Sequence, residues 1–213
     1  MTDASAEFHR QVRTLVDNDY PAASGQTLTD FLALVEPLEG LLGSLPDPSH
    51  DQALPFAIVV TADVVPTTHV MEHVIDGKGK RGLVNMDPVK PEEFSTIATV
   101  EVPDAPAYLI ADIDTGAETL SVRPRDALPI IEGHGRTPLT IDEGVAVLAQ
   151  FPEVLRTHNA YQLLASRRDD KRIPSIWTSY RQPRLGWCWE GNPHTWLGSA
   201  SAARRLGSAA VPS

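Results

Sequence analysis

The chain has 213 residues, with 42% hydrophobic and 22% charged side chains, which is typical of a globular protein built around one core. No run approaches the roughly 20 apolar residues of a transmembrane helix, and the N-terminus lacks the basic and apolar regions of a signal peptide. A single cysteine cannot form an internal disulfide. We therefore expect a single-domain protein of the reducing cytoplasm, with no membrane partner.

The net charge of −10 makes binding to bulk nucleic acid unlikely, but the charge is unevenly distributed. Residues 1–155 carry 9 basic side chains against 25 acidic ones, whereas residues 156–213 carry 9 against 3 and contain all four tryptophans. A basic, aromatic segment suits an anionic ligand with a ring, because aromatic faces stack on bases and guanidinium groups bind phosphate. Equally, the basic segment could pack on the acidic remainder of its own fold.

Hydrophobic spacing predicts a helical N-terminal part within residues 1–45. Apolar side chains fall mostly on one face of residues 5–17, and an Asp-Tyr-Pro turn follows. A second helix is predicted to start at Thr27 or Thr29 and to continue to Leu42. We expect the two helices to form a hairpin that packs on the following segment.

Residues 54–132 mainly follow the pattern of short strands. Four apolar, β-branched runs bounded by proline and aspartate predict these strands. They are 55–61, 81–86, 96–102 and 108–114. A short helix is predicted at 67–74, and the short connections favour antiparallel pairing of the strands into a central sheet.

Helix signals return in residues 137–213. The sequence TIDE at 140–143 fits a capping box and is followed by helical spacing, so we predict a helical segment near 140–166. Strands predicted at 173–178 and 185–189 form a tryptophan-rich C-terminal β element, and the small, polar tail is expected to be loose at its end. The predicted class is α+β, with an N-terminal helical pair, a mostly antiparallel central sheet, this helical segment and the β element.

The stretch GWCWEGNPHTWLGSAS at 186–201 contains three of the four tryptophans, the only cysteine and one of seven histidines. We predict that it forms a pocket for an anionic, partly aromatic small molecule. The predicted ligand-binding residues are Trp187, Trp189, Trp196, Arg156, Arg168, Arg184 and Asn192. His158 and His194 are the candidate catalytic groups for proton transfer. No glycine-rich phosphate-binding loop is present, and the sequence indicates no particular cofactor.

Cys188 has two interpretations. As a thiolate it is a candidate nucleophile for acyl transfer, with Arg184 or a protonated His194 supplying positive charge. Strand alternation, however, places Trp187 and Trp189 on one face and Cys188 on the other. If the tryptophans line a pocket, the cysteine is a small hydrophobic residue of the core.

Asp114 is a further catalytic candidate. With Thr115 and Gly116 it follows an apolar strand, which resembles the signature of retroviral-type aspartic peptidases. That resemblance implies a homodimer in which two copies of Asp114 share one proton. The later glycine element departs from the family pattern, because Glu132 intervenes before it. A strand that ends in an Asp-Gly turn explains the same letters, and a divalent cation bound by Asp112 and Asp114 is another alternative.

The sequence HVMEH at 69–73 matches the pattern of inverted zinc peptidases, in which two histidines one helical turn apart bind the metal. Those enzymes are far larger and need an acidic third ligand that this sequence does not indicate. A solvated amphipathic turn with incidental histidines explains the pattern, and we predict no metal site.

Four segments of the sequence together indicate a family resemblance. The segments are VRPRDALP at 122–129, GRTPLTIDEG at 135–144, LGWCW at 185–189 and NPHTWLGSAS at 192–201. They resemble a family of actinobacterial proteins of about this length that is labelled as a domain of unknown function. The resemblance spans nearly the whole chain. It implies a soluble, cytoplasmic, single-domain protein, and it implies no activity or catalytic residues.

Two functions from different classes fit these patterns. The first is a protein or enzyme that binds a small, anionic molecule in the tryptophan-rich segment. The second is an interaction or regulatory module whose basic tail meets an acidic partner or a second copy in a homodimer.

Overall fold

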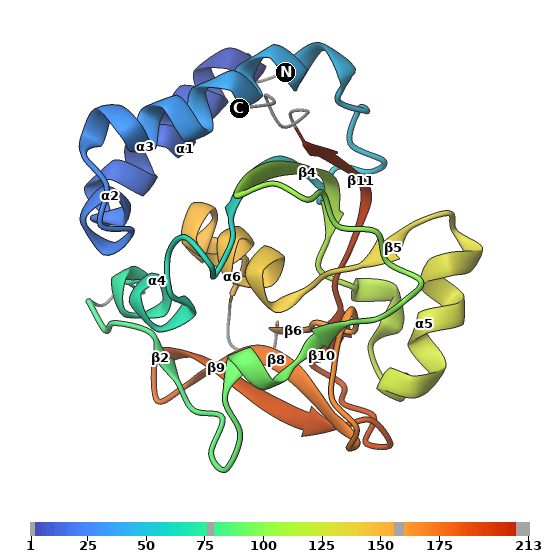
Figure 1. Ribbon diagram of the computed structural model, residues 1–213. Helices are drawn as coiled ribbons and strands as arrows, with labels where there is room; N and C mark the ends of the chain where they lie inside the picture. Colours follow the sequence, from blue (N-terminus) through green and yellow to red (C-terminus); the bar gives the residue numbers. More distant parts are fainter. Residues whose placement is uncertain (1–2, 76–78, 156–159, 208–213) are drawn as a thin grey trace.

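The computed structural model describes residues 3–75, 79–155 and 160–207. Its fold is α+β, as predicted. Two β-sheets enclose the helix α6, and the N-terminal helices lie on the outer side of the first sheet (Figure 1). One main hydrophobic cluster joins side chains of the N-terminal helices, both sheets and α6. Within the described ranges, no helix is both long and apolar enough to cross a membrane.

The N-terminal part is helical, as the hydrophobic spacing predicts. Its elements are α1 Ala4–Asp17, α2 Tyr20–Ala23, α3 Leu28–Val35 and the 3₁₀ helix η1 Glu36–Ser44. Gln11 of α1 is fully buried, and its side chain donates to the Phe56 carbonyl (2.9 Å) and accepts from the Ile58 amide (2.8 Å). These bonds satisfy backbone groups at the edge of the first sheet, so they attach α1 to it.

The first sheet is antiparallel, with the strand order β1, β4, β11 and β5. Its strands are β1 Leu54–Val60, β4 Ala107–Asp114, β11 Ser201–Gly207 and β5 Thr137–Pro138. Strands β1 and β4 confirm two of the predicted apolar runs. Strand β11 lies in the tail, where no strand was predicted, because SAARRLG has little strand propensity of its own. Pairing with β4 on one side and β5 on the other makes it an interior strand.

The second sheet has the strand order β10, β6, β8, β9 and β2. Its strands are β10 Leu197–Ser199, β6 Ala160–Gln162, β8 Arg172–Ser179, β9 Gln182–Trp189 and β2 Leu83–Val84. The hairpin of β8 and β9 is the predicted tryptophan-rich β element. Pairing is parallel between β10 and β6 and between β2 and β9, and antiparallel elsewhere in this sheet.

The helical segment predicted near 140–166 is shorter than expected. Helix α6 is Ile141–Gln150, and the 3₁₀ helix η4, Pro152–Val154, follows it. Farther along, β6 pairs with β8, and β7, Ser166–Arg167, pairs with β3, Ser95–Thr96. Periodicity alone cannot distinguish a short apolar run in a strand from one in a helix. Here the hydrogen bonds to neighbouring strands decide the outcome.

Two further differences concern the part expected to consist mainly of strands. Helix α5, Pro124–Gly133, forms there, with a proline at its first position, where a missing amide hydrogen costs nothing. The strand predicted at 96–102 ends at Thr96 as part of β3, which the 3₁₀ helix η2, Pro91–Glu93, precedes. Helix α4, Thr67–His73, confirms the predicted short helix. The short 3₁₀ helix η3, Ala117–Thr119, follows β4.

Helix α6 is enclosed on nearly all sides. Every residue in it except Asp142 is buried. Gly144 approaches Leu163 so closely that a Cβ at this position would lie 2.2 Å from a Leu163 methyl carbon. The Tyr161 hydroxyl also donates to the Gly144 carbonyl (2.8 Å). A side chain at Gly144 would therefore push α6 away from the second sheet.

The first turn of α6 is held by a buried ion pair. As the capping box predicts, the Glu143 carboxylate accepts from the Thr140 amide (2.8 Å), and the Thr140 hydroxyl accepts from the Glu143 amide (3.3 Å). The same carboxylate pairs with Arg205 of β11 through Nε to Oε1 (2.6 Å) and Nη2 to Oε2 (2.8 Å). The Tyr108 hydroxyl of β4 donates to it at 3.1 Å. Glu143 is 0% exposed, so this network links α6 to the interior of the first sheet.

We predict that Arg205→Met lowers the free energy of unfolding by about 3–5 kcal/mol, because it leaves the buried Glu143 carboxylate without its cation. The neighbouring Arg204 is exposed and makes one long hydrogen bond to the Ser44 carbonyl (3.3 Å). Arg204→Met is therefore the matched control, with an expected change of at most about 0.5 kcal/mol. Urea denaturation followed by circular dichroism measures both changes, and equal losses in the two variants would contradict the assignment.

Candidate functional site

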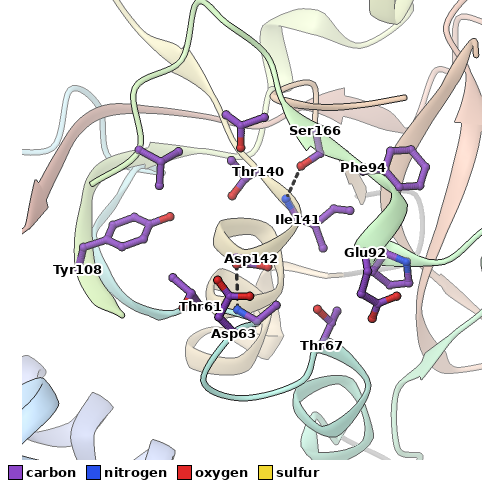
Figure 2. A pocket seen from close by; sticks show the side chains of 14 residues that line it. Thr61, Asp63, Thr67, Glu92, Phe94, Tyr108, Thr140, Ile141, Asp142 and Ser166 are labelled. Carbon is purple, nitrogen blue, oxygen red and sulfur yellow. Dashed lines mark hydrogen bonds between the residues drawn. The ribbon is translucent and has the colours of Figure 1, made fainter. Parts of the chain in front are cut away.

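A cavity of about 280 Å³ opens at the N-terminal end of α6 and is called the α6 cavity below. Its walls come from the loop after β1, the start of α4, the segment 91–96, β4, β7 and the first turn of α6 (Figure 2). Hydroxyl groups line much of it, from Thr61, Thr67, Thr96, Tyr108, Thr140 and Ser166. Its charged lining residues are Asp63, Glu92 and Asp142, and among the described residues no lysine, arginine or histidine lines it.

Asp142 occupies the centre of this site. It is the second residue of α6, so the capping box that starts the helix also fixes its position. Its Oδ2 accepts a hydrogen bond from the Ala62 amide in the loop after β1 (3.0 Å). No hydrogen bond to Oδ1 is recorded within the described chain. Figure 2 shows the carboxylate between the loop and the open part of the cavity.

The Asp142 carboxyl has a raised pKa. Burial is the largest cause, and the negative charges of Glu143 and Asp63 add to it, while the Ala62 amide acts in the opposite direction. Its sequence neighbour Glu143 has a cation, Arg205, but no cation contacts Asp142 among the described residues. A desolvated carboxyl without a counter-ion can hold a proton, accept a donor from a ligand or pair with a cation.

Thr67 provides a second polar group that is available to a ligand. This first residue of α4 is 4% exposed, yet its hydroxyl has no hydrogen-bond partner among the described residues. Figure 2 shows the hydroxyl directed toward the cavity. The Ser166 hydroxyl accepts from the Ile141 amide (2.9 Å), so its proton remains available to donate. Phe94, Ile141 and neighbouring apolar side chains cover the rest of the wall.

Two of the three tryptophans predicted to bind a ligand lie together. The rings of Trp187 and Trp189 are 5.0 Å apart on one face of β9, with Arg172 at 4.5 and 5.0 Å from their centres. The Trp187 indole donates to the Met86 carbonyl (3.1 Å) and packs against the core, whereas Trp189 is 43% exposed. Asp170 pairs with Arg172 at 2.5 Å and balances its charge.

Trp196 and His194 form a separate contact, with ring centres 5.3 Å apart. Nε2 of His194 is buried without a hydrogen-bond partner among the described residues, and burial lowers the pKa of this imidazole. Asn192 is exposed in the turn after β9, where its backbone N–H donates to the Trp189 carbonyl (3.1 Å). Thus His194 and Trp196 form their own pair beside the turn.

Strand alternation separates the remaining predicted residues from the tryptophan face. Arg184 and Cys188 lie on the other face of β9 from Trp187 and Trp189. On that face, the antiparallel register pairs them with Trp177 and Ile173 of β8. Burial raises the pKa of the Cys188 thiol, which disfavours the thiolate. Arg168 pairs with Glu93 and Asp170. The predicted residues Arg156 and His158 lie outside the described residues.

Asp114 ends β4 in a turn. Its Oδ1 accepts from the Gly116 amide (2.6 Å), and its Oδ2 lies 3.2 Å from Nε2 of His50. Asp112 pairs instead with Arg136 (2.6 Å); although burial alone would raise its pKa, bonds from Ser49 and Arg136 lower it. Both carboxylates therefore make hydrogen bonds or ion pairs within the fold, Asp114 in its turn and Asp112 with Arg136.

The two histidines of HVMEH are also in local contacts. Their rings stack with centres 4.1 Å apart, and Nδ1 of His73 lies 2.8 Å from the His69 carbonyl. Nε2 of His69 lies 3.0 Å from the Asn18 carbonyl. Across the described ranges, no three histidine, cysteine or acidic side chains group as ligands for a metal ion.

The α6 cavity was not predicted from the sequence, although the capping box at 140–143 was. Acidic residues are common in the first turn of any helix, so Asp142 carries no functional signal by itself. Thr67 and Ser166 are distant in sequence and meet only through the fold. The sequence showed only that an aspartate precedes the glutamate of the capping box, and this pattern does not by itself indicate a binding site.

Comparison with known proteins gives a family without an assigned activity. A model described as a family of unknown function, DUF5701, matches residues 14–208. No curated protein and no solved structure matches the chain. The match confirms the resemblance to an uncharacterised family that the four sequence segments indicated.

We predict that Asp142→Asn raises the free energy of unfolding at pH 7 by about 0.5–2 kcal/mol, in the range of substitutions that relieve a strained functional site. A folded-state pKa above the usual 3.8 means that the wild type loses stability as pH rises from about 4 through that folded-state pKa. The amide side chain can still accept from Ala62 but has no charge. Urea denaturation across this pH range tests the prediction, and an unchanged pH profile would refute it.

Proposed function

Because the chain belongs to the family of unknown function DUF5701, we propose its function from the α6 cavity: the protein binds a small, hydrogen-bonding molecule there. The volume of about 280 Å³ is close to the lower end of the range for ligand pockets, about 300–1,000 Å³. Most of the side chains that line the cavity carry a hydroxyl or carboxylate group, so the cavity suits a polar molecule that makes several hydrogen bonds.

The unpartnered hydroxyl of Thr67 is the observation that carries this proposal. Although Thr67 is only 4% exposed, its hydroxyl lines the cavity and has no protein partner in the described chain, so it can bond to water or a ligand there. Oδ1 of Asp142 lines the same cavity and likewise bonds to no described residue. Two polar groups that face one cavity and are free to bond support the binding of a polar molecule.

Asp142 is also the group in this cavity best suited to proton transfer. Its raised pKa brings the carboxyl closer to neutral pH than an ordinary aspartate, as general acids and bases require. If the bound molecule is transformed, we assign the proton-transfer step to this residue.

A second candidate is the tryptophan face, with an anionic, partly aromatic ligand. The exposure of Trp189 and the position of Arg172 beside both rings favour it, because stacking and a guanidinium are the contacts such a ligand needs. The pairing of Arg172 with Asp170 reduces its support.

We also propose a cytoplasmic location and an actinobacterial origin, which the lone cysteine and the four resembling segments support. A protein-interaction role for the basic tail, including homodimer formation, has less support. Arg168, Arg172 and Arg205 already pair with carboxylates of this chain, which leaves less charge for a partner.

We predict that Thr96→Trp abolishes ligand binding by filling the mouth of the α6 cavity. Thr96 is exposed at the rim, so a larger side chain there does not disturb the core. Thr99→Trp, three residues away and also exposed, is the matched control. Ligand-observed NMR with a library of small amines, polyols and carboxylates measures binding to the three proteins. Hits that persist in Thr96→Trp would count against the cavity.

The second candidate predicts that nucleotides and acyl-cofactors change the intrinsic tryptophan fluorescence. Trp189→Ala is expected to weaken this binding by about 5- to 100-fold, the range for loss of one stacking ring. Trp177 lies on the opposite face of the hairpin, so Trp177→Phe is the control and should preserve affinity. An unchanged spectrum across the whole panel would eliminate the tryptophan face as the site.

A further inference from the structure

The α6 cavity has a distinct charge pattern. Three carboxylates line it, from Asp63, Glu92 and Asp142, and the described part of the chain adds no basic side chain to the lining. Asp63 and Glu92 are exposed at the rim, whereas Asp142 is the one residue of α6 that is not fully buried. An anionic ligand would be repelled here, so the chemistry of this cavity differs from that of the tryptophan face.

The polar side chains of the cavity can all act as acceptors, because they are hydroxyls and carboxylates. The unpartnered hydroxyl of Thr67 and Oδ1 of Asp142 are both available within the described structure. The hydroxyl of Ser166 can accept a second bond besides the one from Ile141. A group with several donors and a positive charge matches this set.

We propose that the cavity binds a small organic cation, a primary amine that carries further hydroxyl or amino groups. This inference rests on the proposed function and names its ligand class. An ammonium group has three donors and no acceptor, which matches Asp142, Thr67 and Ser166 as acceptors. The additional hydroxyl or amino groups bond to the threonine hydroxyls and to the carboxylates at the rim.

A metal ion fits this cavity less well than an organic cation. It needs several ligating side chains close together, and the described chain places no three suitable ones in a group. An ammonium group needs only acceptors at its three donors, which the carboxylate and hydroxyl groups supply.

The environment of Asp142 supports a cationic ligand. Burial and the charges of Glu143 and Asp63 disfavour its ionised form. A bound ammonium would supply the counter-charge that Arg205 supplies to Glu143. Binding energy would then come from a carboxylate that the fold leaves without a cation.

Isothermal titration calorimetry of the full chain with matched pairs of probes tests the inference. The pairs are 1,4-diaminobutane with 1,4-butanediol, and glucosamine with glucose, so that each pair differs mainly in its charge. We expect the amines to bind more tightly than their neutral partners. Asp142→Asn is expected to weaken amine binding by about 10- to 100-fold, and Thr67→Val by about 2- to 10-fold.

Asp126→Asn is the matched control for removal of one negative charge, because Asp126 is exposed on α5 and is not among the residues that line the cavity. It should leave amine affinity unchanged. Thermal denaturation of each variant checks its fold, and Thr67→Val provides a test that retains every charge.

Equal affinity for the neutral partners, or no measurable binding of either amine, would overturn the inference. The same holds if Asp142→Asn and Asp126→Asn weaken binding equally. Failure of the proposed function has a different signature, because Thr96→Trp would then leave the binding of every probe and library hit intact. If neutral polyols bind as tightly as the amines and Thr96→Trp abolishes their binding, the cavity remains the binding site but its ligand is not an amine.

Discussion

The buried ion pair between Glu143 and Arg205 is the contact on which the position of α6 against the first sheet depends. Burying two charges is costly, and their attraction offsets the cost only when further hydrogen bonds satisfy both groups. Here Tyr108 and Thr140 bond to the carboxylate, while Pro138 and Thr137 accept from the guanidinium. The pair therefore requires β4, β5, β11 and the start of α6 to be in place at the same time.

The ion pair also explains the chemistry of the α6 cavity. Adjacent carboxylates at the start of one helix have opposite environments, because Glu143 points into the fold toward Arg205 and Asp142 faces the cavity. Arg205 balances the charge of Glu143, yet the Glu143 carboxylate still raises the pKa of Asp142. The stabilising network thus holds an unbalanced carboxylate beside an open volume, which is the arrangement expected of a binding group.

Two ion pairs join the basic C-terminal segment to the acidic part of the chain. Arg205 pairs with Glu143 and Arg168 with Glu93, so cations of the C-terminal segment neutralise carboxylates from the acidic part of the chain. This corresponds to the alternative in which the basic segment packs on its own acidic body. The segment remains aromatic at its surface, where Trp189 is exposed beside Arg172. Charge counts along a sequence thus predict attraction between segments but not which pairs remain available to a ligand.

Local sequence signals determined the N-terminal helices, the strands β1 and β4, the β8–β9 hairpin and the capping box of α6, because periodicity and capping act between near neighbours. They also placed Trp187 and Trp189 on one face, opposite Cys188. Only the tertiary structure decided that Ala160–Gln162 is a strand and that Ser201–Gly207 lies inside a sheet, because both depend on partners distant in sequence. It alone brought Thr67, Asp142 and Ser166 to one cavity, since a binding site is a property of distances that a linear pattern does not contain.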